Sequence, residues 1–339
     1  MPEKEIKKQE VPVVAAQPVV QSKSFDFDKK SVGEKKEMKD DQIFDDIIKS
    51  GGLQWEDCVL PSRGIYYGEG ASSVRTPDLP NGAVKVRPMG IDVEKIMASR
   101  RFGNQAVDMM LQHCVRLPEG FDPLDLLIGD RLFLLYYIRG ITYGNQYEFI
   151  MTCPNDDCHK PSTHNFDLNE LARTIKLADP TIDREPFKIV LPFWSSKYGK
   201  EVYVLARFAR GRDMAMMARR AALQRKAITT KPRLEIDGAD EDHSMDSMDG
   251  DAIVQNLNIL ISEIKAGTDL RKDPFEIKQL VEKLHSSDSS TIRSYLDDKA
   301  PGMDPEISVQ CPHCSTDIRT ALPITEGFFR PKIRGGPGE

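Results

Sequence analysis

The feature of this sequence that most restricts its fold is a pair of short cysteine-containing turns. Four residues separate Cys153 from Cys158, and two residues separate Cys311 from Cys314. A proline follows the first cysteine of each turn and stiffens it, so that both sulfur atoms can face one point. Four thiolates from two such turns form a tetrahedral site, and zinc is its usual occupant. The sequence therefore predicts a zinc site with these four cysteines as ligands.

Two other interpretations of the cysteine turns remain open at the level of sequence. The four thiols could be structural side chains that hold no metal. Alternatively, a nearby histidine (His159, His164 or His313) could replace one cysteine as a ligand. A closed set of four protein ligands leaves no open position for water or substrate, so the predicted site is structural rather than catalytic.

The distance between the turns indicates how the chain is organised. They lie about 150 residues apart, far more than the gap within a simple zinc finger. The chain that folds between them must return to its starting point. We therefore expect a clasp at the base of an inserted unit.

Composition and charge exclude several classes of protein. The chain has 339 residues, a net charge of −6 and an apolar content of 40%. An acidic chain argues against a nucleic-acid coat or a polybasic membrane binder. Six cysteines, four of them in the turns, fit a reducing compartment better than a disulfide framework, and Cys58 and Cys114 are expected to be core side chains. The sequence has neither an apolar signal core at its start nor an apolar run long enough to span a bilayer.

The predicted fold class is α+β, with helical and short-strand lobes joined by a four-cysteine, zinc-ribbon-like clasp. Residues 1–40 have the composition of a disordered arm. We expect an N-terminal α+β lobe over residues 41–152. We expect a zinc-clasped C-terminal lobe with a helical insertion over residues 153–331, including a flexible acidic loop at 229–251.

Apolar periodicity predicts the main elements of both lobes. A helix begins the first lobe near residues 41–49. Asp92 and Asp130 are expected to cap two further helices, and the second of these, residues 132–139, is apolar nearly all round and is expected at the centre of the core. The remaining predicted helices are 105–115, 167–176, 213 onward, 252–265, 274–285 and 289–296, and the predicted strands are 83–89, 146–152, 187–192, 201–208 and 318–324.

Three local segments carry more specific expectations. Residues 60–64 read as a rigid turn, with Pro61 fixing one dihedral and Gly64 allowing a positive φ, followed by an extended segment. Residues 195–200 read as a hairpin loop. The aromatic pairs Tyr66-Tyr67 and Phe328-Phe329 could be exposed anchors for a partner, or they could cover the ends of the zinc lobe.

The sequence contains no recognisable catalytic motif. It has no nucleophile elbow, no P-loop and no zinc-protease motif. Asp122, Asp125 and Asp130 could form a carboxylate cluster, but helix capping explains them at least as well.

A nucleic-acid-binding zinc ribbon is the alternative function from a different class. The sequence feature that supports this alternative is a stripe of basic residues, which are Arg207, Arg210, Arg212, Arg219, Arg220, Arg225 and Lys226. The acidic total charge, together with Asp156, Asp157 and Asp317 near the cysteine turns, argues against it. A solvated helix face or an acidic protein partner are the other interpretations of the stripe.

The order of several short motifs resembles the baseplate hub protein family of T-even-type contractile-tailed bacteriophages. The motifs are Leu60-Pro61-Ser62-Arg63-Gly64, Val86-Arg87-Pro88-Met89, Gly129-Asp130-Arg131-Leu132-Phe133, Ile138-Arg139-Gly140, Tyr143-Gly144, the two cysteine turns, Leu191-Pro192 and Phe328-Phe329-Arg330-Pro331. The resemblance covers roughly residues 55–331 and rests on order and spacing.

This resemblance implies a structural or assembly component of the tail baseplate hub that acts by protein–protein contacts and has no enzymatic activity. Its partners would be other tail and baseplate hub proteins, with no small-molecule substrate, nucleic acid or membrane. It would be made in the host cytoplasm and end in the virion tail baseplate. A transient assembly factor absent from the mature virion is the alternative within this reading.

Overall fold

The computed structural model describes residues 53–72, 74–99, 105–181, 184–229, 253–324, 326–329 and 331. The predicted N-terminal arm, the helix expected near residues 41–49 and almost all of the acidic loop 229–251 lie outside the described residues. The predicted lobe boundary after residue 152 stays a prediction.

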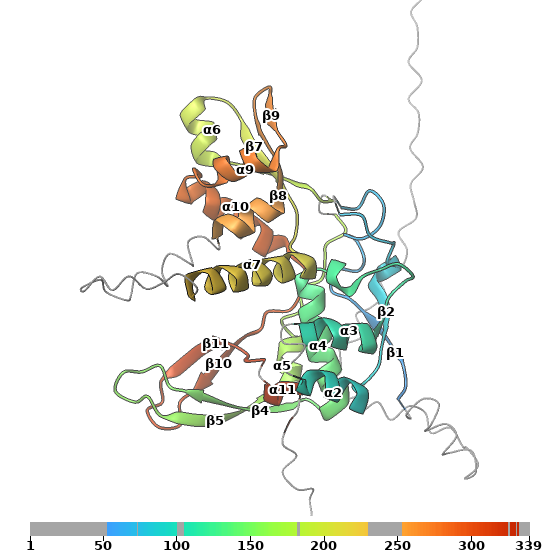
Figure 1. The fold of residues 1–339 in the computed structure, drawn as a ribbon. Helices are drawn as coiled ribbons and strands as arrows, with labels where there is room; N and C mark the ends of the chain where they lie inside the picture. The colour runs from blue at the N-terminus through green and yellow to red at the C-terminus, as the bar shows by residue number, and fades with distance from the viewer. Residues whose placement is uncertain are drawn as a thin grey trace, which may run out of the picture.

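The first part of the described chain, residues 53–145, forms a small antiparallel sheet with helices beside it, which we call the helical lobe (Figure 1). The sheet has the strand order β1-β2-β3. Its elements are β1 (Glu56–Val59), η1 (Pro80–Gly82), β2 (Ala83–Val86), α2 (Ile91–Ala98), α3 (Ala106–Cys114), β3 (Val115–Arg116), η3 (Pro123–Asp125) and α4 (Ile128–Tyr143). Cys58 and Cys114 are buried in the core of this lobe, as expected.

Helix α4 lies at the centre of the core, which confirms the expectation drawn from its apolar sequence. Its buried side chains include Phe133, Tyr136 and Ile138. Arg139 is also buried, and its guanidinium donates hydrogen bonds to the carbonyl oxygens of Gly144 and Gln146 at the end of the helix, 2.7 and 3.1 Å away. These acceptors lie in the connection from α4 to β4, so the buried guanidinium ties the end of the helix to the first residue of that strand.

Two β-hairpins form a thin projection, which we call the hairpin arm (Figure 1). Strand β4 (Gln146–Thr152) pairs with β5 (Pro161–Asp167), and β10 (Glu306–Gln310) pairs with β11 (Asp317–Ala321). The strand predicted at 146–152 is confirmed residue for residue. Helix α5 (Leu168–Ala172) follows β5 and is capped by the side chain of Asp167, which accepts a hydrogen bond from the Asn169 amide.

The remaining described residues form an antiparallel sheet with the order β6-β7-β8-β9, covered by helices, which we call the sheet lobe (Figure 1). Its elements are β6 (Phe187–Val190), α6 (Pro192–Tyr198), β7 (Val202–Ala206), a helix at 253–260, β8 (Ile261–Ala266), β9 (Asp269–Arg271), α9 (Pro274–Val281) and α10 (Ser286–Lys299). The long helix α7 (Gly211–Thr229) extends between this lobe and the arm, and α11 (Glu326–Phe329) lies beside the base of the arm.

Two predicted elements of the sheet lobe are wrong. Residues 195–200 are not a hairpin loop, because Pro192 occupies the first turn of α6 and Gly199 ends that helix with a φ of 62°. The helix predicted over 252–265 ends at residue 260, and its second half is β8. Ile261 and Ile264 are buried there on strand β8, where β-branched side chains fit a half-buried sheet.

The two predicted aspartate caps are also wrong. The residue before α2 is Gly90, and Asp92 lies inside the first turn, where its carboxylate accepts a hydrogen bond from Arg87 at 2.7 Å. The residue before α4 is Leu127, and Asp130 is a fully buried residue within the helix. The Asp92 carboxylate thus binds Arg87 as well as backbone amides of the first turn, whereas the Asp130 carboxylate binds groups outside its helix.

The interpretation of the two aromatic pairs as exposed anchors is wrong. Tyr66 and Tyr67 are 0% and 3% exposed, and Phe328 and Phe329 are 0% and 3% exposed. The turn at residues 61–66 runs straight into the tyrosines with no extended segment, because Arg63 and Gly64 both have positive φ and fold the chain back. Gly64 has the positive φ expected, at 76°, and a side chain there would collide with the Leu79 carbonyl oxygen.

Among the described residues, no helix combines the length and apolar character that crossing a bilayer requires.

Candidate metal centre

Each of the two cysteine turns closes one hairpin of the arm. Strand β4 delivers Cys153 and β10 delivers Cys311, and in both turns the amide of this first cysteine donates to a carbonyl at the start of the returning chain. The acceptors are Lys160 at 3.1 Å and Thr316 at 3.0 Å. The residue after the second cysteine has a left-handed backbone in each turn, with φ of 42° at His159 and 57° at Ser315. The two hairpins therefore end in the same kind of knuckle.

The four cysteine sulfur atoms form one compact cluster, and all lie within 4.8 Å of one another. The Sγ atoms of Cys153 and Cys314 are 3.6 Å apart, and those of Cys158 and Cys311 are 3.9 Å apart. Disulfide sulfurs would lie about 2.05 Å apart, and all four cysteines are free. A tetrahedron with zinc–sulfur bonds of about 2.3 Å has sulfur–sulfur edges of about 3.8 Å. The donor set and its spacing thus fit a tetrahedral thiophilic cation.

Backbone amides surround the sulfur atoms. Hydrogen bonds to Cys153 from the Asn155 amide and to Cys158 from the Lys160 amide lower the pKa of each thiol. Burial and the neighbouring thiols outweigh this effect and raise the pKa of Cys153 to about 12. At Cys314 the hydrogen bonds to the side chain and amide of Thr316 dominate and lower the pKa to about 6. A cation at the centre of the cluster would deprotonate a coordinating thiol outright.

A polar contact holds the two turns together. The side-chain amide of Asn155 donates to the Thr316 hydroxyl oxygen at 3.0 Å, which joins the first turn to the second. Because Thr316 also bonds to Cys314, this contact supports the outer part of the cluster.

The histidines considered as alternative ligands lie outside the sulfur cluster. The imidazole of His164 is buried, 2.8 Å from the Ser162 hydroxyl and stacked on Phe149. His159 lies 3.6 Å from the carboxylate of Asp156, and the exposed His313 does not belong to the cluster either. Cys58 and Cys114 are core side chains, and burial raises the pKa of Cys114 to about 12.

The position of the cluster corrects one expectation. A clasp was expected at the base of the inserted unit, but the unit leaves the arm after Asp167 and returns at Glu306. In the hairpin registers these residues pair with Gln146 and Ala321 at the ends opposite the turns. The cysteine turns lie at the outer tip of the arm (Figure 1). The cluster therefore joins two hairpin tips to each other.

The basic stripe does not form one continuous face. Arg207 pairs with Asp213 at 2.7 Å, Arg210 is buried against Glu185 at 3.1 Å, and Arg212 reaches two carboxylates. Arg219 and Arg220 are exposed on α7, and the side chains of Arg225 and Lys226 lie outside the described residues. Three of the seven residues of the expected stripe are thus used for contacts within the chain.

Of the three aspartates considered as a carboxylate cluster, Asp122 and Asp125 share a partner and Asp130 lies apart from them. Asp122 accepts a hydrogen bond from the Leu124 amide at 2.9 Å and caps η3, which is the capping role expected for it. Asp122 and Asp125 both pair with Arg212. Asp130 is buried elsewhere, where it accepts hydrogen bonds from the Ser62 amide and the Tyr67 hydroxyl.

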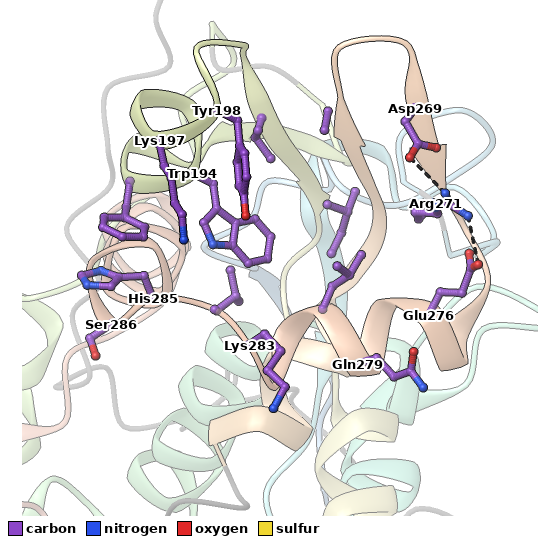
Figure 2. A pocket seen from close by; sticks show the side chains of 16 residues that line it. Trp194, Lys197, Tyr198, Asp269, Arg271, Glu276, Gln279, Lys283, His285 and Ser286 are labelled. Carbon is purple, nitrogen blue, oxygen red and sulfur yellow. Dashed lines mark hydrogen bonds and ion pairs between the residues drawn. The ribbon is translucent and has the colours of Figure 1, made fainter.

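One surface feature of the structure was not predicted from the sequence. A groove with a volume of about 1030 Å³ opens in the sheet lobe between α6 and α9 (Figure 2). Trp194 and Tyr198 of α6 form one side of it. The signal was present in the sequence, because Pro192 at a helix start and aromatic residues four positions apart are typical of one helix face.

Comparison with known proteins supports the resemblance that the order of the motifs indicated. The family model for the T4 bacteriophage base plate protein matches residues 71–330. A search of curated proteins and a search of solved structures gave no significant match. The match spans most of the chain and includes both cysteine turns and all the elements from β2 to α11. This chain therefore belongs to the family of T4 bacteriophage base plate proteins.

Proposed function

We propose that this chain is a structural or assembly component of the central hub of a contractile-tail baseplate and acts there through contacts with other tail proteins. Membership of the base plate family supports the general role. We further propose that Cys153, Cys158, Cys311 and Cys314 hold one structural zinc ion. The single observation that carries this second part is the sulfur cluster at the arm tip.

The geometry of the arm supports a contact role in preference to catalysis. Four protein sulfurs close the coordination sphere and leave no position for substrate. The arm projects from the body, and each of its hairpins is a two-stranded sheet with unpaired strand edges, which are typical sites for contacts with another chain (Figure 1). A metal at the tip would make the arm rigid, so that a partner meets a preformed surface.

The test of hub function is a purification of the protein's own particles and assembly intermediates. We expect the chain to co-purify with hub proteins from infected cells, and to be found by mass spectrometry in finished particles. Its presence in assembly complexes and absence from finished particles would indicate a transient assembly factor. Association only with baseplate parts outside the hub would contradict the proposal.

The contribution of the arm is tested with Cys311→Ser and with Cys58→Ser as a matched control, since Cys58 is a buried thiol outside the cluster. We expect the first variant to lose hub proteins in the co-purification and the second to retain them. Equal retention by both variants would show that the arm is not a contact surface.

A further inference from the structure

The groove between α6 and α9 has an apolar floor. Its lining includes Val202 and Ile264 of the sheet, which are almost fully buried, and the partly buried Leu280 of α9, while Trp194 lines it on the α6 side (Figure 2). The larger apolar side chains of the lining, Trp194, Leu280 and Leu284, are only partly buried, so the groove leaves apolar surface in contact with water. Grooves of this size and lining are typical of binding sites for apolar side chains.

The rim of the groove is aromatic and exposed on the α6 side. Tyr198 is 62% exposed and Phe193 is 37% exposed, and Phe193 stacks on His285 with ring centres 3.8 Å apart. Exposed aromatic side chains bury a large area on binding and lose little conformational entropy. The rim therefore offers contacts that the described part of the chain does not use.

The charges on the rim are unequally distributed. Arg271 is neutralised by Asp269 and Glu276, each 3.0 Å away. Lys197 and Lys283 form no ion pair with any residue in the described ranges. Lys197 lies near the rings of Phe193 and Tyr198, at 5.9 and 5.6 Å from their centres. The groove thus combines apolar surface with two cations that have no carboxylate partner, and it suits a ligand that carries apolar side chains and carboxylates.

Residues 40–49 of the chain have this composition. The segment carries the four aspartates Asp40, Asp41, Asp45 and Asp46. It also carries four large apolar side chains, which are Ile43, Phe44, Ile47 and Ile48. The apolar positions recur at the spacing of one helix face, with aspartates beside them. An amphipathic helix that lays its apolar face into a groove is a common mode of peptide recognition.

The segment of one molecule cannot reach the groove of the same molecule. Five residue steps join residue 48 to Leu53, and an extended chain of that length spans at most about 18 Å. The chain enters the helical lobe next to β1, whereas α6 lies at the opposite end of the molecule (Figure 1). We propose that the groove between α6 and α9 binds residues 40–49 of a second copy of this chain. Such a head-to-tail contact can close into a ring, and it does not depend on the proposed place in the hub.

The binding test uses a fluorescent peptide with the sequence of residues 38–50 and the full chain. We expect Lys197→Glu with Lys283→Glu to weaken peptide binding at least tenfold. A peptide with its four aspartates changed to asparagine should weaken binding to the same extent. Lys278→Glu is the matched control, because Lys278 lies on α9, outside the lining of the groove, and pairs with Glu282. No binding to the unchanged chain, or equal binding by all variants, would overturn the proposal.

Charge reversal on both sides separates a specific contact from a loss of folding. The groove variant Lys197→Glu with Lys283→Glu should be monomeric in analytical ultracentrifugation, whereas the unchanged chain should associate as its concentration rises. A variant that also carries Asp45→Lys and Asp46→Lys should associate again. A chain that stays monomeric at every concentration would overturn the second copy as occupant. The groove variant could instead self-associate like the unchanged chain but no longer co-purify with another baseplate protein. That result would also overturn the second copy as occupant, and it would indicate that a segment of the other protein binds in the groove.

Discussion

The hairpin arm and the core around α4 are stabilised by different means. The apolar cluster at the arm tip contains only three buried residues, Cys153, Cys311 and Ile318. The main cluster runs from Cys58 to Phe329 and includes most of the large buried side chains of the described residues. The inner parts of both hairpins belong to the main cluster through Tyr147, Phe149, Phe166 and Ile307. The three side chains buried at the tip cover too little area to offset the entropy of ordering the two cysteine turns. The tip therefore needs a cross-link that the body does not need.

The largest effect is expected from removal of the proposed zinc ion. Removal of zinc by a chelator, or Cys311→Ser, should unfold the arm, because apparent zinc-binding free energies of about 10–16 kcal/mol in small domains are also folding free energies. Hydrogen exchange should then be fast in the strands next to the turns and stay slow in α4. Elemental analysis should find one zinc per chain before removal.

Cys58→Ser is the control for this comparison. It places a hydroxyl in the main core, so it should lower the stability of the body and leave the metal content unchanged. An arm that keeps its protection from exchange after the metal is removed would show that its three buried residues suffice.

The next largest effect concerns the buried ion pair of the body. The guanidinium of Arg210 is 2% exposed and bonds to Glu185 at 3.1 Å, to the Tyr66 carbonyl at 2.9 Å and to the Asp125 carbonyl at 2.8 Å. Arg210→Met should destabilise the protein by about 3–5 kcal/mol in urea unfolding, because Glu185 would remain buried and unpaired. Its zinc content should stay at one per chain.

The double variant Arg210→Met with Glu185→Leu sharpens this result. Since the unpaired carboxylate is then absent, part of the loss should be recovered. A double variant less stable than Arg210→Met alone would mean that Glu185 acts mainly through its other hydrogen bonds, such as the one from the Phe208 amide at 2.7 Å.

Phe328→Ala should cost a similar or slightly smaller amount. The ring is fully buried and packs edge-on against Tyr136 of α4 and Tyr147 of β4, with centres 5.3 and 5.0 Å apart. Loss of a buried phenylalanine costs about 3–5 kcal/mol. Thermal melts should show a lower melting temperature for the body, with normal zinc content at the arm tip.

Phe275→Ala is the matched control for Phe328→Ala, because Phe275 is 67% exposed. It should leave the melting temperature nearly unchanged. A Phe328→Ala protein as stable as this control would contradict the packing described here.

The sequence was most informative where local pattern and tertiary structure agree. Cysteine spacing was enough to find the sulfur cluster, since knuckle turns are set by a few adjacent residues. Strand β4 and helix α4 were predicted because alternation and continuous apolar character are strong local signals. Membership of the base plate family was inferred from the order of motifs and is confirmed.

The features that were not predicted depend on contacts between distant residues. Whether Phe328 is exposed depends on Tyr136 and Tyr147, which lie far from it in sequence. The location of the cysteine turns at the arm tip depends on where the inserted unit leaves the hairpins. In the sequence, Asp130 lies where a residue that caps a helix would lie. Its actual partner, the Ser62 amide, belongs to a turn far away in the sequence.

The smallest effect expected is a pH dependence at Asp130, a charged group of the body with no counterpart at the arm tip. Its carboxylate is fully buried and accepts hydrogen bonds from the Ser62 amide at 3.0 Å and the Tyr67 hydroxyl at 2.6 Å. Burial raises the pKa of Asp130, although the hydrogen bonds and the charge of Arg210 oppose the shift. Burial also raises the pKa of Tyr67 well above its usual value, so this neighbour stays neutral.

A carboxyl whose pKa is raised on folding contributes stability that is present at acid pH, below its unfolded pKa, and is lost as the pH rises through its folded pKa. Asp130→Asn cannot ionise; its amide oxygen can still accept from the Ser62 amide, but its amide nitrogen cannot accept from the Tyr67 hydroxyl, so one hydrogen bond with a net contribution of about 1 kcal/mol is lost at every pH. The free energy of unfolding is measured in urea at a series of pH values for Asp130→Asn and for the unchanged chain. As the pH rises from about 4 to 7, Asp130→Asn should gain stability relative to the unchanged chain. Asp57→Asn, at an exposed position on β1, serves as the control for the loss of one negative charge. A shift in favour of the unchanged chain over that range would show that Ser62, Tyr67 and Arg210 together outweigh the burial of the carboxylate.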